Sequence, residues 1–250
     1  MFSIHSLIFT LVTLVALQTF LIQTSLAIRG GMKSDITKEP WTVSIYVNGS
    51  LCGGSILTVN FILTAGQCVY QIPLEQIMIR YGSNDYLVGG HMMGVQKVFI
   101  FERYRPETGE NNIAILETKD PMMLDLKKSK PINLPSVEFC PQAGSEVLVS
   151  GWGATQDGSQ FYSRDLMAAN FKVIDTKICE KEYGSLIYWG EFCAGDNYTS
   201  LETGDAGDPA VQNETLVGVG TFKPLTTRMP SVFTSVGSYV NWIKEITGQN

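Results

Sequence analysis

Short runs of β-branched and aromatic residues, separated by glycine and asparagine turns, recur along most of this chain. Runs of this length and composition between turn residues are typical of antiparallel β-sheets. The runs predicted to be strands are 41–47, 55–63, 77–81, 95–101, 146–150, 171–174 and 215–221. The sequence therefore predicts an all-β protein. With 250 residues, 44% of them hydrophobic, the chain is long enough for a large core.

Only the C-terminal end has a helical pattern. Over residues 238–247, Val240, Ile243 and Ile246 are apolar at helical spacing, and Gly248 follows as a stop signal. We therefore expect a single terminal helix.

The first 27 residues differ in composition from the rest. They contain no Asp, Glu, Lys or Arg, include a long apolar run, and end in a small-x-small motif at 25–27. This arrangement is typical of a secretory signal peptide. A membrane anchor is the alternative, but Gln18 and Gln23 interrupt the apolar stretch. We expect residues 1–27 to be removed and a secreted chain to begin at Ile28.

Three separated segments carry the strongest motif signal. They read Leu-Thr-Ala-Gly-Gln-Cys at 63–68, Asn-Asn-Ile-Ala-Ile-Leu at 111–116 and Gly-Asp-Ala-Gly-Asp-Pro at 204–209. In order and separation they resemble the T-A-x-H-C, N-D-I-A-L-L and G-D-S-G-G-P motifs of trypsin-like, chymotrypsin-fold serine proteases. The resemblance extends over 28–250.

In that family the three motifs carry a His-Asp-Ser triad, and here all three positions are replaced, by Gln67, Asn112 and Ala206. The serine needs an imidazole to accept its proton, and the imidazole needs a carboxylate to orient it. An amide does not titrate near neutral pH, and a methyl group cannot attack a carbonyl. The resemblance therefore implies a proteolytically inactive homologue. An enzyme built on His91 or Cys140 is the alternative, but a lone histidine is more often a solvated side chain.

The resemblance also implies the architecture. Members of the family fold into two six-stranded antiparallel β-barrels followed by a C-terminal helix. We expect one trypsin-like domain with an N-terminal lobe at 28–130 and a C-terminal lobe at 131–250.

Five further positions of the expected substrate pocket depart from the family pattern: Ser200, Asp208, Phe222, Lys223 and Ser231. Ser200 stands where trypsins have an aspartate, so no preference for Lys or Arg is expected. Lys223 and Ser231 replace glycines and should narrow or plug the cleft. Asp208 also replaces a glycine, and would add an anion near the place where a scissile carbonyl develops negative charge. Surface drift after relaxed selection is the alternative for Lys223 and Asp208.

The motif frame keeps one functional group of the family, the carboxyl of Asp205. In active relatives the freed N-terminal ammonium, here that of Ile28, inserts into the body and pairs with this carboxylate. A buried ammonium needs such a partner. We expect the same pair in the cleaved chain.

The five cysteines of a secreted chain indicate disulfides. The resemblance implies the pairs Cys52–Cys68 and Cys179–Cys193. Cys140 is left over, either as a free thiol or in an intermolecular bridge, and we favour a free, buried thiol.

Charge and the remaining motifs limit the ligands. The net charge of −6 argues against nucleic acid or heparin as a partner. Sequons at Asn48, Asn197 and Asn213 permit N-glycans. The stretch matching the family's calcium loop, 83–91, has Asp85 as its one acidic residue, so we expect no calcium, and no other metal or cofactor.

The set of replacements most resembles the scabies mite inactivated protease paralogues, which are related to mite trypsin-like allergens. That resemblance implies interference with host complement proteins. We therefore expect a secreted, monomeric, non-catalytic protein whose partners are host serum or complement proteins, with no nucleic-acid or membrane partner. The alternatives are an inert decoy or allergen-like protein and a residual serine-type endopeptidase.

Overall fold

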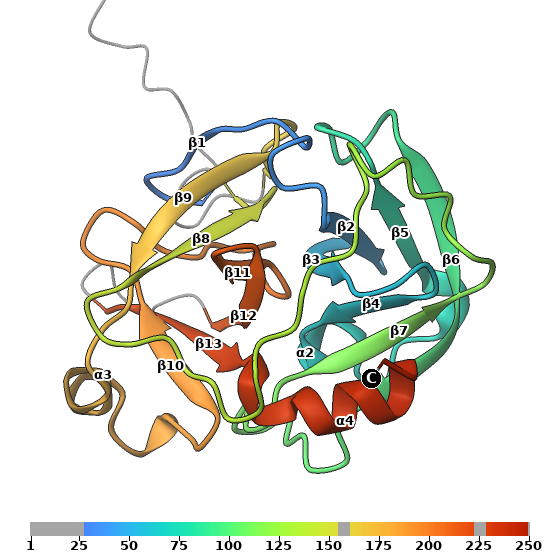
Figure 1. Ribbon diagram of the computed structural model, residues 1–250. Helices are drawn as coiled ribbons and strands as arrows, with labels where there is room; N and C mark the ends of the chain where they lie inside the picture. The colour runs from blue at the N-terminus through green and yellow to red at the C-terminus, as the bar shows by residue number, and fades with distance from the viewer. Residues whose placement is uncertain (1–27, 155–160, 223–228, 250) are drawn as a thin grey trace, which may run out of the picture.

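A computed structural model of the chain describes residues 28–154, 161–222 and 229–249 (Figure 1). The predicted signal peptide, 1–27, and the pocket residue Lys223 lie outside the described residues. Within the described residues, no helix has both the length and the apolar character needed to cross a membrane.

The first half of the chain forms a closed antiparallel barrel, drawn at the right of Figure 1, with strand order β2-β3-β4-β7-β6-β5. Its strands are β2 (Thr42–Val47), β3 (Ser50–Ile56), β4 (Phe61–Thr64), β5 (Ile77–Tyr81), β6 (His91–Ile100) and β7 (Ala114–Thr118). Strand β5 shows the expected period of two, since Ile77, Ile79 and Tyr81 are buried while Met78 and Arg80 are half-buried.

The second half forms a seven-stranded sheet with the order β1-β9-β8-β11-β12-β13-β10. Its strands are β1 (Met32–Lys33), β8 (Glu146–Gly151), β9 (Met167–Lys172), β10 (Glu191–Ala194), β11 (Pro209–Gln212), β12 (Thr215–Phe222) and β13 (Ser231–Ser235). A bridge between Val173 and Ala194 joins the end of β9 to β10, and Gly195 N donates to Lys172 O at 2.9 Å. Strands β8 to β13 thus curl into a second barrel, with β1 added outside β9. The predicted all-β, two-barrel fold is confirmed.

Two local predictions were wrong. The run 55–63 is not one strand, because the chain turns after β3 with Leu57 N donating to Phe61 O at 2.9 Å. A helix that was not predicted, α3 (Thr176–Tyr183), follows Asp175, whose side chain accepts from Lys177 N as an N-cap. Cys179 is the one residue of α3 assigned as buried, so the helix has no apolar stripe for sequence analysis to detect.

The terminal helix α4 (Val240–Thr247) is confirmed and ends at Gly248, which is left-handed with φ 69°. The other short helices are α2 (Gly66–Val69) and the 3₁₀ turns η2 (Leu74–Gln76), η3 (Gly184–Leu186) and η4 (Val236–Tyr239). Ile243 and Tyr239 pack in the core of the first barrel, while β1 pairs with the second. Each end of the described chain therefore packs on the lobe formed by the other half.

Polar contacts join the two lobes. Thr42 Oγ1 and Ser150 Oγ lie 2.7 Å apart in a buried hydrogen bond. On the surface, Arg164 Nη2 lies 2.6 Å from Asp85 Oδ2. The motif segments meet at the junction between these barrels.

Candidate functional site

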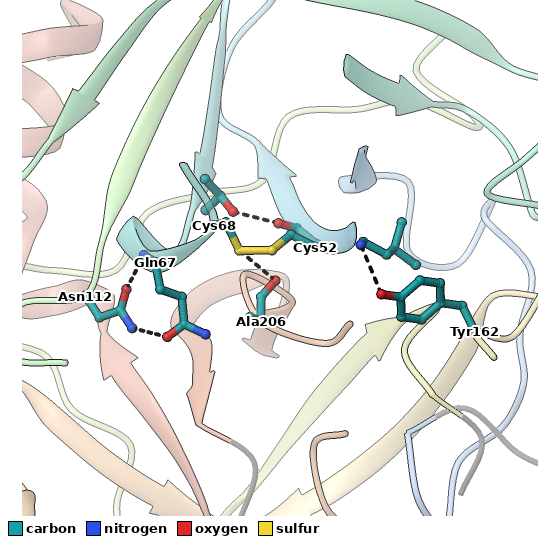
Figure 2. The surroundings of a disulfide bond; sticks show 9 residues. Cys52, Gln67, Cys68, Asn112, Tyr162 and Ala206 are labelled. Carbon is teal, nitrogen blue, oxygen red and sulfur yellow. Dashed lines mark hydrogen bonds between the residues drawn. A yellow bond between two sulfur atoms is a disulfide. The ribbon is translucent and has the colours of Figure 1, made fainter. Parts of the chain in front are cut away.

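The structure brings the three replaced triad positions together. Gln67 lies on α2, Asn112 precedes β7, and Ala206 lies in the loop before β11. Asn112 Nδ2 donates to Gln67 Oε1 at 2.5 Å, and Gln67 N donates to Asn112 Oδ1 at 2.9 Å (Figure 2). The two side-chain amides form a fixed pair where an imidazole and a carboxylate are expected in the family.

Ala206 is held beside this pair by the first barrel. Its carbonyl accepts from Gly53 N at 2.8 Å, and the Cys68 sulfur lies 3.5 Å from the same oxygen (Figure 2). Because Cys68 is disulfide-bonded to Cys52, that sulfur has no proton and the approach is a contact only. The position of the nucleophile therefore presents a methyl group.

Neither alternative catalytic group lines the cleft beside Ala206. His91 is exposed and is the first residue of β6 rather than a loop residue, and its ring stacks on Tyr81 at 5.2 Å between centroids. Cys140 is free and exposed, so the prediction of a buried thiol was wrong. Partial burial of the sulfur still raises the pKa of this thiol.

A hollow of about 290 Å³ remains beside Ala206, lined by residues of both lobes that include Gln67, Tyr162, Glu202 and Thr221. Tyr162 was not singled out from the sequence. Its hydroxyl accepts from Leu51 N at 3.3 Å, and its ring covers Gly204, where an added Cβ would lie 2.8 Å from the nearest ring carbon. Gly204 has φ 101°, so both the backbone and Tyr162 require glycine there. No local sequence pattern marks Tyr162, because its position depends on the fold around Gly204.

Two expected pocket residues are held in buried hydrogen bonds and are not among the residues lining this hollow. Ser231 is fully buried, and its Oγ accepts from Leu201 N at 2.8 Å. Ser200 is also fully buried, and its Oγ donates to Glu202 Oε1 at 3.3 Å. The prediction that Ser231 narrows the cleft by protruding into it is not what the geometry shows. Phe222 is the last residue of β12.

Asp208 does not add an anion to the cleft, in contrast to the prediction. Its side chain is fully buried between Gly53 of β3 and Gly151 of β8, each of which lies so close that an added Cβ would collide with the carboxyl group. Neither carboxyl oxygen has a hydrogen-bond partner in the described part of the chain. Burial, and secondarily the neighbouring carboxyl of Asp205, raises the pKa of Asp208 well above 3.8. The folded state therefore favours the protonated form of this carboxyl, which lies in the seam between the lobes.

Asp205 keeps the role of a buried structural acceptor. Its Oδ1 accepts from Gly153 N and its Oδ2 from Glu202 N, both at 2.8 Å. Burial nevertheless raises its pKa to about 7. Ile28 is fully buried in the core of the second barrel. In the full-length chain the Ile28 nitrogen belongs to a peptide bond, so its ion pair with Asp205 stays a prediction for the cleaved form.

Both predicted disulfides form, with Cα atoms 6.3 Å apart for Cys52–Cys68 and 6.1 Å apart for Cys179–Cys193. Disulfides of this kind fit an extracellular protein. The three sequon asparagines, Asn48, Asn197 and Asn213, are all exposed, and their glycosylation stays a prediction. In the described ranges, no group of three or more His, Cys, Asp or Glu side chains is placed to hold a metal ion.

Two antiparallel β-barrels with the three motif positions facing one another at their junction define the class: a chymotrypsin-like serine protease fold, with two amides and a methyl group at its catalytic positions.

Comparison with known proteins gives the family. Residues 28–243 match the trypsin family, and the chain belongs to it. The crystal structure of scabies mite inactivated protease paralogue S-D1 is 49% identical, has a TM-score of 0.85, and the match covers 88% of this chain and 97% of that one. Paralogue S-I1 is 43% identical with a TM-score of 0.80, over 89% and 100% of the two chains. Trypsin Blo t 3 of Blomia tropicalis is 32% identical over 82% of this chain and 80% of its own length. These similarities confirm the resemblance drawn from the motifs.

Proposed function

We propose that this protein is secreted, has no proteolytic activity, and acts by binding host serum proteins, with complement components as the expected class. The observation that carries the proposal is the amide pair of Gln67 and Asn112, together with Ala206, which lines the same hollow as Gln67. These three positions supply no nucleophile and no group that exchanges a proton at neutral pH.

The expected loss of activity is large. In a subtilisin triad, removal of one to three members lowers kcat by about 10⁴ to 10⁶-fold, and the effects are not additive. With Gln67, Asn112 and Ala206 in place, the residual rate should therefore be indistinguishable from background.

A binding role is supported by what the chain has retained. Both disulfides, the Asp205 acceptor and the closed first barrel maintain a rigid surface. Similarity to the inactivated paralogues of a parasitic mite favours host proteins as partners. A rigid scaffold of this kind binds with little loss of conformational entropy.

Two measurements test the proposal. A panel of chromogenic peptide substrates should give no turnover above a heat-denatured sample. Reproducible turnover would refute the proposal that the protein has no proteolytic activity. The immobilised protein should capture defined serum proteins, identified by mass spectrometry, that a denatured sample does not capture. If no serum protein is captured specifically, the binding proposal fails and an inert protein remains.

A further inference from the structure

An apolar hollow lies on the outer face of the first barrel, away from the triad positions. We call it the β5 groove and define it by Tyr46, Met78, Arg80, Leu87 and Met92, which line a hollow of about 180 Å³. Tyr46 pairs with Met78 across β2 and β5, and Arg80 pairs with Met92 across β5 and β6. Two adjacent rows of side chains therefore face outward together.

Three apolar members of the β5 groove are open to solvent. The side chains of Tyr46, Leu87 and Met92 are 43%, 44% and 46% exposed. Contiguous exposed apolar side chains are uncommon on a monomer and mark binding surfaces. Tyr, Met and Arg are enriched in protein interfaces, and methionine adapts its shape to different partners.

Arg80 supplies the groove with an uncompensated charge. Its Nε donates to Tyr86 O at 3.0 Å, its Nη2 to Leu87 O at 2.8 Å, and its Nη1 to Gly89 O. These acceptors are neutral carbonyl groups, and no ion pair of Arg80 occurs among the described residues. A guanidinium has five N–H donors, so two remain for a ligand.

The wall of the groove is held in place before any partner arrives. The Arg80 guanidinium holds the loop 82–90 through its bonds to the loop carbonyls. Asp85 holds the same loop from within, since its Oδ1 accepts from Leu87 N at 2.8 Å. Asp85 Oδ2 is itself held by Arg164 of the other lobe at 2.6 Å. A preformed wall reduces the entropy that binding must overcome.

A second cationic side chain, Lys119, lies near the groove but is not among the residues that line it. Met78 pairs with Gly94 of β6, and the stem of Lys119 lies beside Gly94, 3.6 Å from where a Cβ would stand. Arg80 and Lys119 thus flank the apolar rows. Both cations are complementary to carboxylates.

We infer that the β5 groove binds a partner segment that carries an apolar side chain flanked by carboxylates. The apolar side chain enters the hollow beside Met78 and Met92, and a carboxylate accepts from the free N–H groups of Arg80. The inference rests on the proposed binding function and names the surface that performs it. Because the whole chain has a net charge of −6, attraction for an acidic segment is local to the groove.

The direct test uses a fluorescent peptide in which Asp and Glu alternate with Leu and Phe, and a second peptide with Lys in place of the acids. Fluorescence anisotropy with the full chain should give the acidic peptide a Kd on the order of 10 µM, with the lysine peptide at least about tenfold weaker. Raising the salt from about 0.05 M to about 0.3 M should weaken the acidic peptide several-fold. Equal affinity for both peptides overturns the inference.

Variants localise the binding. Met92→Glu and Leu87→Glu add an anion at an exposed position of the groove, and each should weaken the acidic peptide by about tenfold. The matched control is Ile178→Glu on α3 in the other lobe, where the side chain is 55% exposed, and it should bind like the wild type. The two groove variants keep the inference testable if one of them unfolds. Unchanged affinity in folded groove variants overturns it.

Serum capture separates this inference from the proposed function. If the wild type captures serum proteins and both groove variants capture them equally well, the proposed function stands and the groove inference is wrong. If the acidic peptide binds the groove but no serum protein is captured, the inference that the groove binds acidic segments is supported and the proposed function is wrong. Loss of serum capture in Met92→Glu and Leu87→Glu, but not in Ile178→Glu, supports both.

Discussion

Replacing Asp208 by asparagine should stabilise the protein, and the gain should grow as the pH rises. Asparagine has nearly the same shape but cannot ionise, so the variant keeps the packing between Gly53 and Gly151 and removes the titration. The Asp208 carboxyl is fully buried and has no hydrogen-bond partner in the described ranges, and its pKa is raised well above 3.8. Its ionised form is therefore strongly disfavoured in the folded state.

The sign and size follow from proton linkage. Below about pH 4 both the folded and unfolded chains hold the proton, so the two proteins should differ little. Above 3.8 the unfolded chain releases its proton while the folded chain keeps it. The free energy of unfolding of the wild type then falls, relative to Asp208→Asn, by about 1.4 kcal/mol per pH unit. The difference should keep growing with pH until the folded carboxyl itself ionises.

Urea unfolding followed by tryptophan fluorescence, at several pH values between about 2 and 7, measures this difference. Asp125→Asn is a control in which the pKa shift of the replaced carboxyl, and therefore the pH dependence of its contribution to stability, has the opposite sign. Backbone N–H groups of Lys127 and Lys128 lower the pKa of the exposed Asp125 carboxyl to about 2, so its contribution to stability is present above its ordinary pKa of 3.8 and is lost towards pH 2. Parallel stability curves for wild type and Asp208→Asn across this range would refute the assignment of a buried, protonated Asp208.

Three other results are expected. The triple variant Gln67→His, Asn112→Asp and Ala206→Ser should hydrolyse small p-nitroanilide peptides no faster than background, because the Tyr162 ring still covers Gly204 beside the nucleophile position; turnover clearly above the parent protein would show an open substrate site. Iodoacetamide should add one adduct to the folded protein, at Cys140, and mass spectrometry should show a rate that is still rising with pH at 9.0, because partial burial raises the thiol pKa above that ordinary value; no adduct, or several, contradicts this. Calcium should leave the melting temperature unchanged because Arg80 already holds the loop 82–90, and a rise of more than about 2 °C would contradict it.

Motif spacing predicted that the three replaced triad positions come together in the fold. Gln67, Asn112 and Ala206 meet as expected because the barrel strands next to them, β4, β7 and β11, fix their positions. The disulfide pairs were predicted from the family resemblance, and both form. The run of β-branched and aromatic residues predicted the bounds of β5 correctly, at 77–81.

Features that depend on distant residues could not be predicted in this way. The Asp208 side chain is buried because two glycines from different lobes leave space for it, and nothing in its own motif indicates this. Tyr162 covers Gly204 through a contact that no periodicity encodes. Helix α3 escaped detection because a surface helix with one buried residue has no hydrophobic pattern.

Because of where the Asp208 side chain lies, whether Gly151 can be replaced by a larger residue depends on which residue occupies position 208. At Gly151 the three atoms nearest to an added Cβ all belong to the Asp208 side chain, so alanine there collides with the aspartate, and glycine at position 208 would remove those three contacts. At Gly53 the Asp208 Cα itself lies 2.9 Å from such a Cβ, so the same replacement does not release that position. A lineage that acquired Asp208 therefore lost the freedom to vary Gly151, and the order in which these two sites change decides which sequences remain folded.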